Sequence, residues 1–235
     1  METRVAVVTG GNRGVGLEIC RQLASNGILV VLTARDEKKG SQAVKALEQS
    51  GLSGVIFHQL DVTDRSSIML LVEFIRTKFG KFNILVNNAA IGGTTIDPER
   101  LRELLEQDPK FISNEGVIKV LSDIDNLSDE KLKDVASIFL KDFKDGNLEA
   151  HGWQPVVSAY AVSKTLVNAY SRLLAKRHPS LEVCCVNPGF VKTDMNYGIG
   201  LISVEEGANA PVRLALQEAC SDSCLYFEQC EISEF

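Results

Sequence analysis

The chain begins with an apolar run, a glycine-rich turn and an amphipathic segment, and this order strongly restricts the fold. Residues 4–8 (Arg-Val-Ala-Val-Val) predict a short strand, and the turn Thr-Gly-Gly-Asn-Arg-Gly-Val-Gly follows at 9–16. Apolar residues then recur at helical spacing, at Leu17, Ile19, Cys20 and Leu23. Glycines let the backbone approach a pyrophosphate, and a helix N-terminus offers it unpaired N–H groups. We therefore predict a dinucleotide-binding turn, although a tight strand-to-helix connection alone would also explain the glycines.

The spacing of this turn is Gly-x-x-x-Gly-x-Gly rather than Gly-x-Gly-x-x-Gly. Its candidate cofactor contacts are Gly10, Asn12, Arg13, Gly14, Val15 and Gly16. About 20 residues further on, where an acidic residue would bind a ribose hydroxyl, the chain has Arg35. A guanidinium there favours a 2′-phosphate, and Arg13 offers a second positive charge. We predict NADPH rather than NADH, the alternative being that both arginines merely face solvent.

Strand and helix patterns alternate along the first part of the chain. Apolar runs predict strands at 28–33, 55–60 and 82–86, and periodic segments predict helices at 36–49 and 64–79. One face of the second helix carries Ile68, Leu71, Val72, Ile75 and Phe79. This βαβαβαβ order predicts an α/β fold with a doubly wound parallel sheet of Rossmann type.

The last part of the chain returns to the same alternation. It predicts a helix at 158–177, a strand at 181–186, a helix at 204–218 and a strand near Leu225. The chain has 235 residues, of which 45% are hydrophobic and 24% are charged. These values fit one globular domain over residues 1–235, with no low-complexity linker.

Polar residues follow several of the predicted strands. Because the carboxyl ends of parallel strands meet at one edge of the sheet, we expect them to line a ligand site there. Asp61 and Val62 are candidate contacts to the adenine, and Asn87 and Asn88 lie at the end of the fourth strand. The late strand leads into Asn-Pro-Gly-Phe-Val-Lys-Thr at 187–193, a rigid turn at the same edge. Each segment taken alone could be an ordinary loop.

Tyr160 and Lys164 are spaced one helical turn apart in Ser-Ala-Tyr-Ala-Val-Ser-Lys at 158–164. An adjacent ammonium stabilises a phenolate and lowers the pKa of the phenol, which makes the pair a usable proton donor. An amphipathic helix can also carry such a pair on its surface without any chemistry. The neighbouring motifs favour the catalytic interpretation.

Charge and cysteine content exclude several classes of function. The formal net charge is −6, so we expect neither nucleic acid nor a membrane surface as a partner. No run reaches the length of a membrane span and no segment has signal-peptide form, which predicts a soluble cytoplasmic protein. The six cysteines and three histidines lack metal-ligand spacing. We expect no metal site and reduced thiols.

The region from Gly92 to Pro155 breaks the alternation. Amphipathic helices are predicted at 98–107 and 128–143, the second burying Leu132, Val135, Phe139 and Phe143. Residues 116–121 are ambiguous between a short strand and a helix. No segment here has the clean apolar run of a buried parallel strand.

Taken together, these segments resemble the short-chain dehydrogenase/reductase family, and within it the monomeric carbonyl-reductase branch of plants. The resemblance covers residues 1 to about 95 and 110 to 235. The motifs that carry it are 9–16, 32–36, 58–62, 87–89, Tyr160 with Lys164, and 188–196. It implies an NADPH-dependent reductase of a hydrophobic ketone, such as the monoterpenoid menthone, that acts as a cytoplasmic monomer.

The resemblance also assigns roles to residues. Tyr160 would donate a proton to the substrate carbonyl, while Lys164 would lower the tyrosine pKa and hold the nicotinamide ribose. Residues after the late strand would clamp the nicotinamide carboxamide: Pro188, Gly189, Val191 and Thr193. Ala90 stands where the family has a glycine after Asn-Asn-Ala.

The family also carries a serine at the end of a fifth strand, after a long fourth crossover helix. Here residues 110–115 and 121–127 resemble the branch's helical insertion before the tyrosine, so about 96–155 is a shortened region with a helical flap. In one interpretation, residues 116–121 replace the fifth strand and Ser122 replaces the serine. In the other, which we favour, this strand and its serine are absent and the chain is a shortened form of the family. The alternative to the reductase function is that such a form is catalytically impaired and binds only NADP(H) or a partner.

Overall fold

The structure is a computed structural model that describes residues 3–92, 99, 103, 112–217 and 225–233. The chain divides into two compact units. The first comprises Met1–Ile91, Val186–Glu218 and Glu228–Glu231, and the second comprises Gly92–Cys185, Ala219–Phe227 and Ile232–Phe235. Each unit has its own architecture and is described separately.

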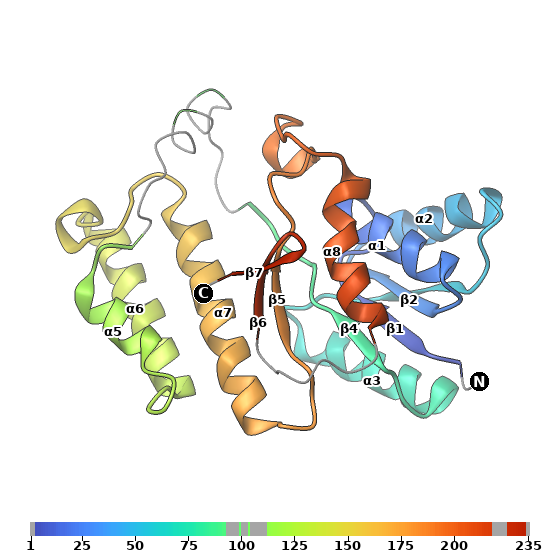
Figure 1. Ribbon diagram of the computed structural model, residues 1–235, viewed down its shortest axis with the longest axis horizontal. Coiled ribbons are helices and arrows are strands. Elements are labelled where there is room, and N and C mark those ends of the chain that lie inside the picture. The colour runs from blue at the N-terminus through green and yellow to red at the C-terminus, as the bar shows by residue number, and fades with distance from the viewer. Residues whose placement is uncertain (1–2, 93–98, 100–102, 104–111, 218–224, 234–235) are drawn as a thin grey trace. The chain divides into compact units, whose positions relative to one another are not determined.

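A parallel sheet forms the centre of the first unit (Figure 1). Its strands are β1 (Val5–Val8), β2 (Leu29–Ala34), β3 (Val55–Gln59) and β4 (Ile84–Val86). They lie in the order β3-β2-β1-β4, and every neighbouring pair is parallel. This order confirms the α/β fold that the alternating pattern predicts.

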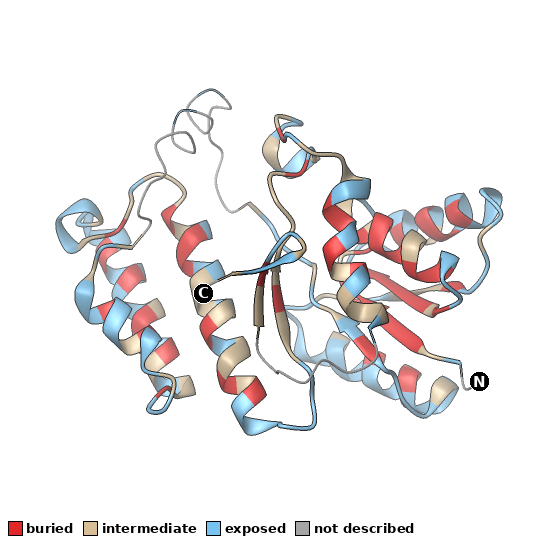
Figure 2. Ribbon diagram, viewed as in Figure 1, coloured by how far each residue is buried: buried red, intermediate tan, exposed pale blue. Residues whose placement is uncertain are grey.

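Helices cover both faces of this sheet. They are α1 (Gly14–Ser25), α2 (Glu37–Gln49), α3 (Arg65–Phe79) and α8 (Val204–Leu216). Ala6 and Val8 of β1 belong to a core cluster shared with α1, α2 and α8. Val5 and Val7 belong to a second cluster, shared with α3. Since successive strand residues point to opposite faces, the uninterrupted apolar run of β1 fills both cores, and all four residues are buried (Figure 2).

Helix α3 buries less of its apolar surface than the sequence predicts. Leu71 and Ile75 are buried, with 7% and 6% of their surface exposed, but Val72 is 49% exposed. The ring of Phe74 lies against His58 of β3, with centroids 4.7 Å apart and the ring planes tilted by 44°. The helix is therefore turned toward β3, and of its predicted apolar face Ile68 and Val72 are exposed, at 39% and 49%.

The second unit is mainly helical. It contains α5 (Glu115–Ser122), α6 (Asp129–Asp145), the 3₁₀ turn η1 (Glu149–His151) and α7 (Ser158–Arg177). Their shared core includes Val117, Leu132, Phe139, Trp153 and Val162. The predicted helical flap before the tyrosine is thus present as α5, α6 and η1. The helix predicted at 98–107 lies outside the described residues, apart from Glu99 and Glu103.

The ambiguous segment at 116–121 is a helix. Val117 and Leu121, four residues apart, are both buried on one face of α5. Asn114 caps the helix, since its side-chain oxygen accepts a hydrogen bond from the Val117 N–H at 3.0 Å. The interpretation of this segment as a substitute fifth strand is therefore wrong, and Ser122 is the last residue of a helix rather than a strand-end serine.

Helix α6 differs from its predicted pattern at one position. Leu132, Val135 and Phe139 are buried as expected, but Phe143 is 55% exposed. Asp142 takes the fourth buried position and is only 5% exposed. The 3-4-3 spacing of the buried stripe selects residue 142 rather than 143, and polar partners of Asp142 compensate for its burial.

A second sheet contains β5 (Cys184–Asn187), β6 (Leu225–Glu228) and β7 (Glu231–Ser233), in that order. Among the described residues, no strand stands between β4 and α7, where only an isolated bridge joins Ile112 to Trp153. The two sheets are separate. No helix among the described residues is long and apolar enough to cross a membrane.

Candidate functional site

The glycine turn after β1 has a backbone that only glycines adopt easily. Gly10 and Gly14 have φ angles of 64° and 54°. The Gly11 N–H donates to the Thr33 carbonyl of β2 at 2.9 Å, which holds the turn against the sheet. At Gly16, a Cβ would lie 2.5 Å from the Gly10 carbonyl oxygen. The turn folds back on the first turn of α1 so closely that no side chain fits there.

The end of β4 braces this turn. The Asn88 side-chain amide donates to the carbonyls of Thr9 and Gly10, at 2.9 and 3.2 Å. The Ala89 N–H donates to the Thr9 hydroxyl at 2.9 Å. Asn88 was predicted as a cofactor contact, and in the structure its amide positions the turn. Asn87, beside it, is exposed.

The N-terminus of α1 is open to an anion. Its N-cap residue, Arg13, makes no side-chain capping bond, and the first turn holds no acidic residue. By contrast, Asp36 caps α2, Asp64 caps α3 and Ser203 caps α8 through their side-chain oxygens. The N–H groups at Val15 and Gly16 and the helix dipole are therefore available to a phosphate. The glycine cradle and this helix end together fit a dinucleotide pyrophosphate.

Both candidate arginines lie at this edge of the first unit. Arg35 directly follows β2 and is exposed. Its backbone carbonyl accepts a hydrogen bond from the Gln59 side chain at 2.9 Å, which fixes its backbone beside β3. The Arg13 guanidinium forms an exposed ion pair with Asp194, with Nη1 3.5 Å from Oδ2. Asp194 was not among the predicted site residues.

The segment after β3 forms a local turn. The Asp61 carboxylate accepts from the Thr63 N–H at 2.9 Å and from the Thr63 hydroxyl at 2.7 Å. These bonds hold the pKa of Asp61 below its usual value. Val62, 45% exposed, leaves an apolar surface at the strand end. This geometry is compatible with the predicted adenine contact.

The segment after β5 lies beside the glycine turn. A Cβ on Gly14 would meet Thr193 Cγ2 at 3.6 Å. Thr193 begins the 3₁₀ turn η2 (Asp194–Asn196) with a capping box, and Gly189 has a φ of 87°. Val191 is 5% exposed because its side chain packs on α8, where a Cβ on Gly207 would lie 2.4 Å from it. The Val191 side chain is therefore not accessible to a ligand.

Tyr160 and Lys164 lie in the second unit, on the first turns of α7. The Lys164 ammonium nitrogen is 5.6 Å from the centre of the Tyr160 ring, and the tyrosine is 40% exposed. The predicted proximity of phenol and ammonium is confirmed. The first turns of α7 are anchored by the buried residues Ser158, Ala161 and Val162.

Burial, rather than mutual attraction, governs the titration of this pair. It raises the pKa of Tyr160 and lowers the pKa of Lys164. The predicted lowering of the tyrosine pKa by the lysine is therefore wrong for this structure. The physical reason is that the ammonium lies over the ring, while desolvation disfavours the charged forms of both groups.

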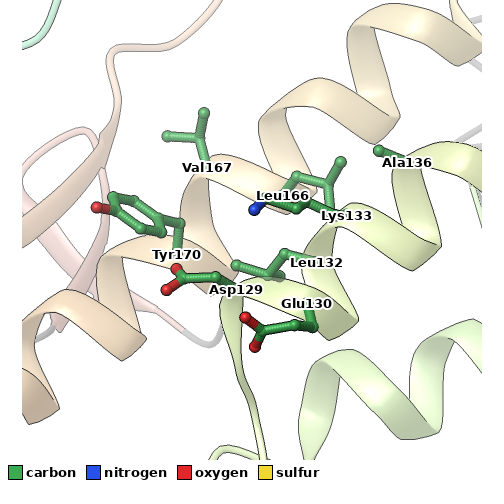
Figure 3. A pocket seen from close by; sticks show the side chains of 8 residues that line it. All are labelled: Asp129, Glu130, Leu132, Lys133, Ala136, Leu166, Val167 and Tyr170. Atoms are coloured by element: carbon green, nitrogen blue, oxygen red, sulfur yellow. The ribbon is translucent and has the colours of Figure 1, made fainter.

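A groove of about 490 Å³ lies between α6 and α7, and Figure 3 gives its lining. The lining residues are Asp129, Glu130, Leu132, Lys133, Ala136, Leu166, Val167 and Tyr170. Neither Tyr160 nor Lys164 lines it, so this groove is not part of the candidate site.

Apart from Lys164, which lies in the second unit, the predicted cofactor residues all lie in the first unit. The glycine turn, the ends of β2, β3 and β4 and the 188–196 segment share one edge of the first unit. Three residues outside the predicted site hold the turn and Arg13: Thr9, Thr33 and Asp194. The position of Thr9, between a buried strand and the first glycine, was the available signal.

This fold and these motifs define a dinucleotide-binding α/β protein. The family described as short chain dehydrogenase matches residues 4–114. The chain is 42% identical to (+)-neomenthol dehydrogenase of Arabidopsis thaliana, over 99% of this chain and 98% of that relative. The protein therefore belongs to the short-chain dehydrogenase/reductase family of oxidoreductases.

Two solved structures are similar over nearly their whole length. Salutaridine reductase from Papaver somniferum gives a TM-score of 0.87 at 37% identity, covering 95% of this chain and 99% of that one. Menthone neomenthol reductase from Mentha piperita gives 0.86 at 33% identity, covering 98% and 100%. Structures that share the fold at lower identity were solved with NADH and with NADPH.

The chain is shorter than these relatives. The alignment with the Arabidopsis protein extends over 291 positions, whereas this chain has 235 residues. Since 291 exceeds 235 by 56, at least 56 alignment positions have no counterpart here. This difference agrees with the expectation that an internal segment is missing.

Proposed function

We propose that this protein reduces a hydrophobic ketone, of the monoterpenoid class that includes menthone, with NADPH as the reductant. The observation that carries the proposal is the Tyr160–Lys164 pair, with its ammonium 5.6 Å from the ring centre, in a chain that also has the glycine turn. The names of the relatives support a small terpenoid or related ketone as substrate.

In this proposal, the bound nicotinamide supplies a hydride to the carbonyl carbon. Tyr160 donates a proton from its hydroxyl to the carbonyl oxygen as negative charge develops there. A phenol is protonated at neutral pH, so Tyr160 begins the reaction as an acid. Lys164, whose ammonium lies beside the ring, would hold the nicotinamide ribose.

The preference for NADPH rests on Arg13 and Arg35. Arg13 lies in the glycine turn and Arg35 directly follows β2, at the edge where the pyrophosphate fits. Both side chains are exposed. A guanidinium binds a phosphate through charge-assisted hydrogen bonds. Its hydrogen bonds to the uncharged hydroxyl of a ribose are weaker. The expected cytoplasmic location and monomeric state are part of the same proposal.

One observation favours a second candidate function. The main sheet ends at β4, and no described residue provides a strand between β4 and α7. A missing fifth strand would remove the serine that orients the substrate carbonyl. Loss of such a donor costs about two to three orders of magnitude in rate. The chain would then be a shortened form that binds NADP(H) with little or no turnover.

Two measurements on the purified chain separate these candidates. NADPH binding is measured by titration, and turnover is measured as NADPH consumption with menthone. We expect binding and measurable reduction, at a rate below that of a full-length relative in the same assay. Tight binding with no turnover across a panel of hydrophobic ketones would refute the reductase and support the binding form. Absence of binding would refute both.

A further inference from the structure

The second unit holds a buried carboxylate that the proposed reaction does not use. Asp142 occupies a core position on α6, aligned with Leu132, Val135 and Phe139, and is 5% exposed. A core position of an amphipathic helix is normally apolar, because burying a carboxylate is costly without compensating bonds. Such a residue calls for a specific partner.

Asp142 has two partners from the same short segment. One carboxylate oxygen accepts from the Trp153 indole N–H at 2.8 Å, and the other lies 2.8 Å from His151 Nδ1. The Trp153 ring is 2% exposed and packs edge-on against Phe139, with centroids 5.3 Å apart. The carboxylate therefore fixes the direction of the indole as well as its position.

The backbone of this segment is held from a third side. The His151 carbonyl accepts from the Asn114 side chain at 2.8 Å, and the Gly152 carbonyl accepts from the Ser113 N–H at 2.7 Å. A Cβ on Gly152 would lie 2.7 Å from the Asn114 nitrogen. Residues 151–153 are thus clamped between α5 and α6, and we call them the clamp segment.

The clamp segment leads directly to the catalytic helix. Val157, four residues after Trp153, is the N-cap of α7 and has a φ of 55°. A β-branched residue rarely adopts this left-handed conformation, and it persists only where the surrounding structure imposes it. The constraint comes from both sides: the clamp before it, and the buried residues Ser158 and Ala161 after it. Tyr160 stands in this first turn.

We propose that Asp142 is a positioning residue for Tyr160, acting through Trp153 and the strained start of α7. Its carboxylate fixes the backbone conformation with which the chain enters α7. That conformation determines the direction in which the Tyr160 phenol points. The predicted effect of Asp142 on turnover rests on the proposed function. Its effect on the order of the first turn of α7 is independent of any reaction.

The chain contains a single tryptophan, Trp153, so its fluorescence reports on this contact alone. The experiment compares the intact chain with Asp142→Ala, Asp142→Asn and a control, Asp134→Asn, which changes an exposed carboxylate of the same helix. Amide hydrogen exchange over residues 156–165 measures the order of the first turns of α7. Menthone reduction and NADPH affinity are measured in parallel.

We expect Asp142→Ala to shift the Trp153 emission, to speed exchange over 156–165, and to lower kcat about tenfold with unchanged NADPH affinity. Asp142→Asn keeps an acceptor for the indole and should restore most of both properties, and Asp134→Asn should match the parent. If Asp142→Ala does not fold, Trp153→Phe, which removes the indole N–H donor together with part of the buried ring, decides by the same exchange measurement.

If Asp142→Ala shifts the Trp153 emission but leaves amide exchange over 156–165 unchanged, the positioning role is overturned. Unchanged Trp153 emission in Asp142→Ala would also overturn it. An intact chain that shows no turnover leaves the exchange result to decide. In that case faster exchange supports the role of Asp142 while the proposed reductase function fails.

Discussion

The guanidinium of Arg13 and the carboxylate of Asp194 form an ion pair across the mouth of the glycine turn, with 3.5 Å between Nη1 and Oδ2. Both side chains are largely exposed, so the pair is weak and easily exchanged for another anion. A 2′-phosphate that recruits Arg13 must compete with Asp194. This competition gives the first prediction.

Asp194→Ala should tighten NADPH binding by about twofold to fivefold, the range of an exposed ion pair. NADH affinity should stay the same, because NADH lacks the phosphate. Titrations of both cofactors at low salt test this difference. Asp125→Ala, which breaks an exposed Asp125–Lys176 pair in the second unit, is the matched control. An equal change for both cofactors would remove Arg13 from the phosphate site.

Arg35→Asp should weaken NADPH by about tenfold to hundredfold, the range for a lost hydrogen bond to a charged group. NADH affinity should hold or improve, since a carboxylate can accept from ribose hydroxyls. Arg65→Asp, at the exposed start of α3, controls for the change in net charge. If the ratio of the two affinities is the same before and after, Arg35 does not bind the phosphate.

Gly16→Ala should abolish dinucleotide binding and destabilise the chain by about 1–3 kcal/mol, the usual cost of overpacking. The added Cβ would lie 2.4 Å from Asn88 Nδ2 and would force the braced turn apart. Gly27→Ala is the control, because Gly27 has a φ of 76° but nothing within 4 Å of the new atom. It should cost about 1 kcal/mol of backbone strain and keep binding intact. Chemical denaturation and NADPH titration measure both effects, and binding by Gly16→Ala would contradict the account of the turn.

Lys164→Met should change how stability depends on pH. Burial lowers the pKa of Lys164, so the folded chain releases its proton more readily than the unfolded chain. The intact chain therefore gains stability as pH rises from below the lowered pKa toward the ordinary value of 10.5. In Lys164→Met this gain should disappear, whereas Lys176→Met, at a lysine of the same helix that pairs with Asp125, should keep it. Denaturation curves across this alkaline window test the sign, and a larger gain in Lys164→Met would contradict it.

The fold of the first unit was largely predictable because its turn residues, its hydrophobic pattern and its helix caps all indicate the same strands and helices. The glycine turn, the apolar strands and the capped helices α2 and α3 agree with one another, and Asp36 and Asp64 begin their helices where the sequence places them. The roles of individual side chains were harder to predict. Asn88 was expected at the cofactor, yet its amide is bound to the turn.

The second unit was less predictable because polar contacts override the hydrophobic pattern there. Asp142 is buried in place of Phe143 because the Trp153 indole and the His151 imidazole both contact its carboxylate. Neither residue belongs to α6, so the helical pattern alone does not reveal these contacts. The short segment in α5 was ambiguous because a run of six residues fits either period. Its neighbours in the core, rather than its composition, make it a helix.

The most direct test is the rate of NADPH consumption with menthone by the intact chain and by Tyr160→Phe. The account predicts measurable reduction that falls by about 10²–10⁴-fold in Tyr160→Phe, with NADPH affinity unchanged because the dinucleotide residues lie in the other unit. Reduction by Tyr160→Phe at the rate of the intact chain would contradict the assignment of Tyr160 as the proton donor.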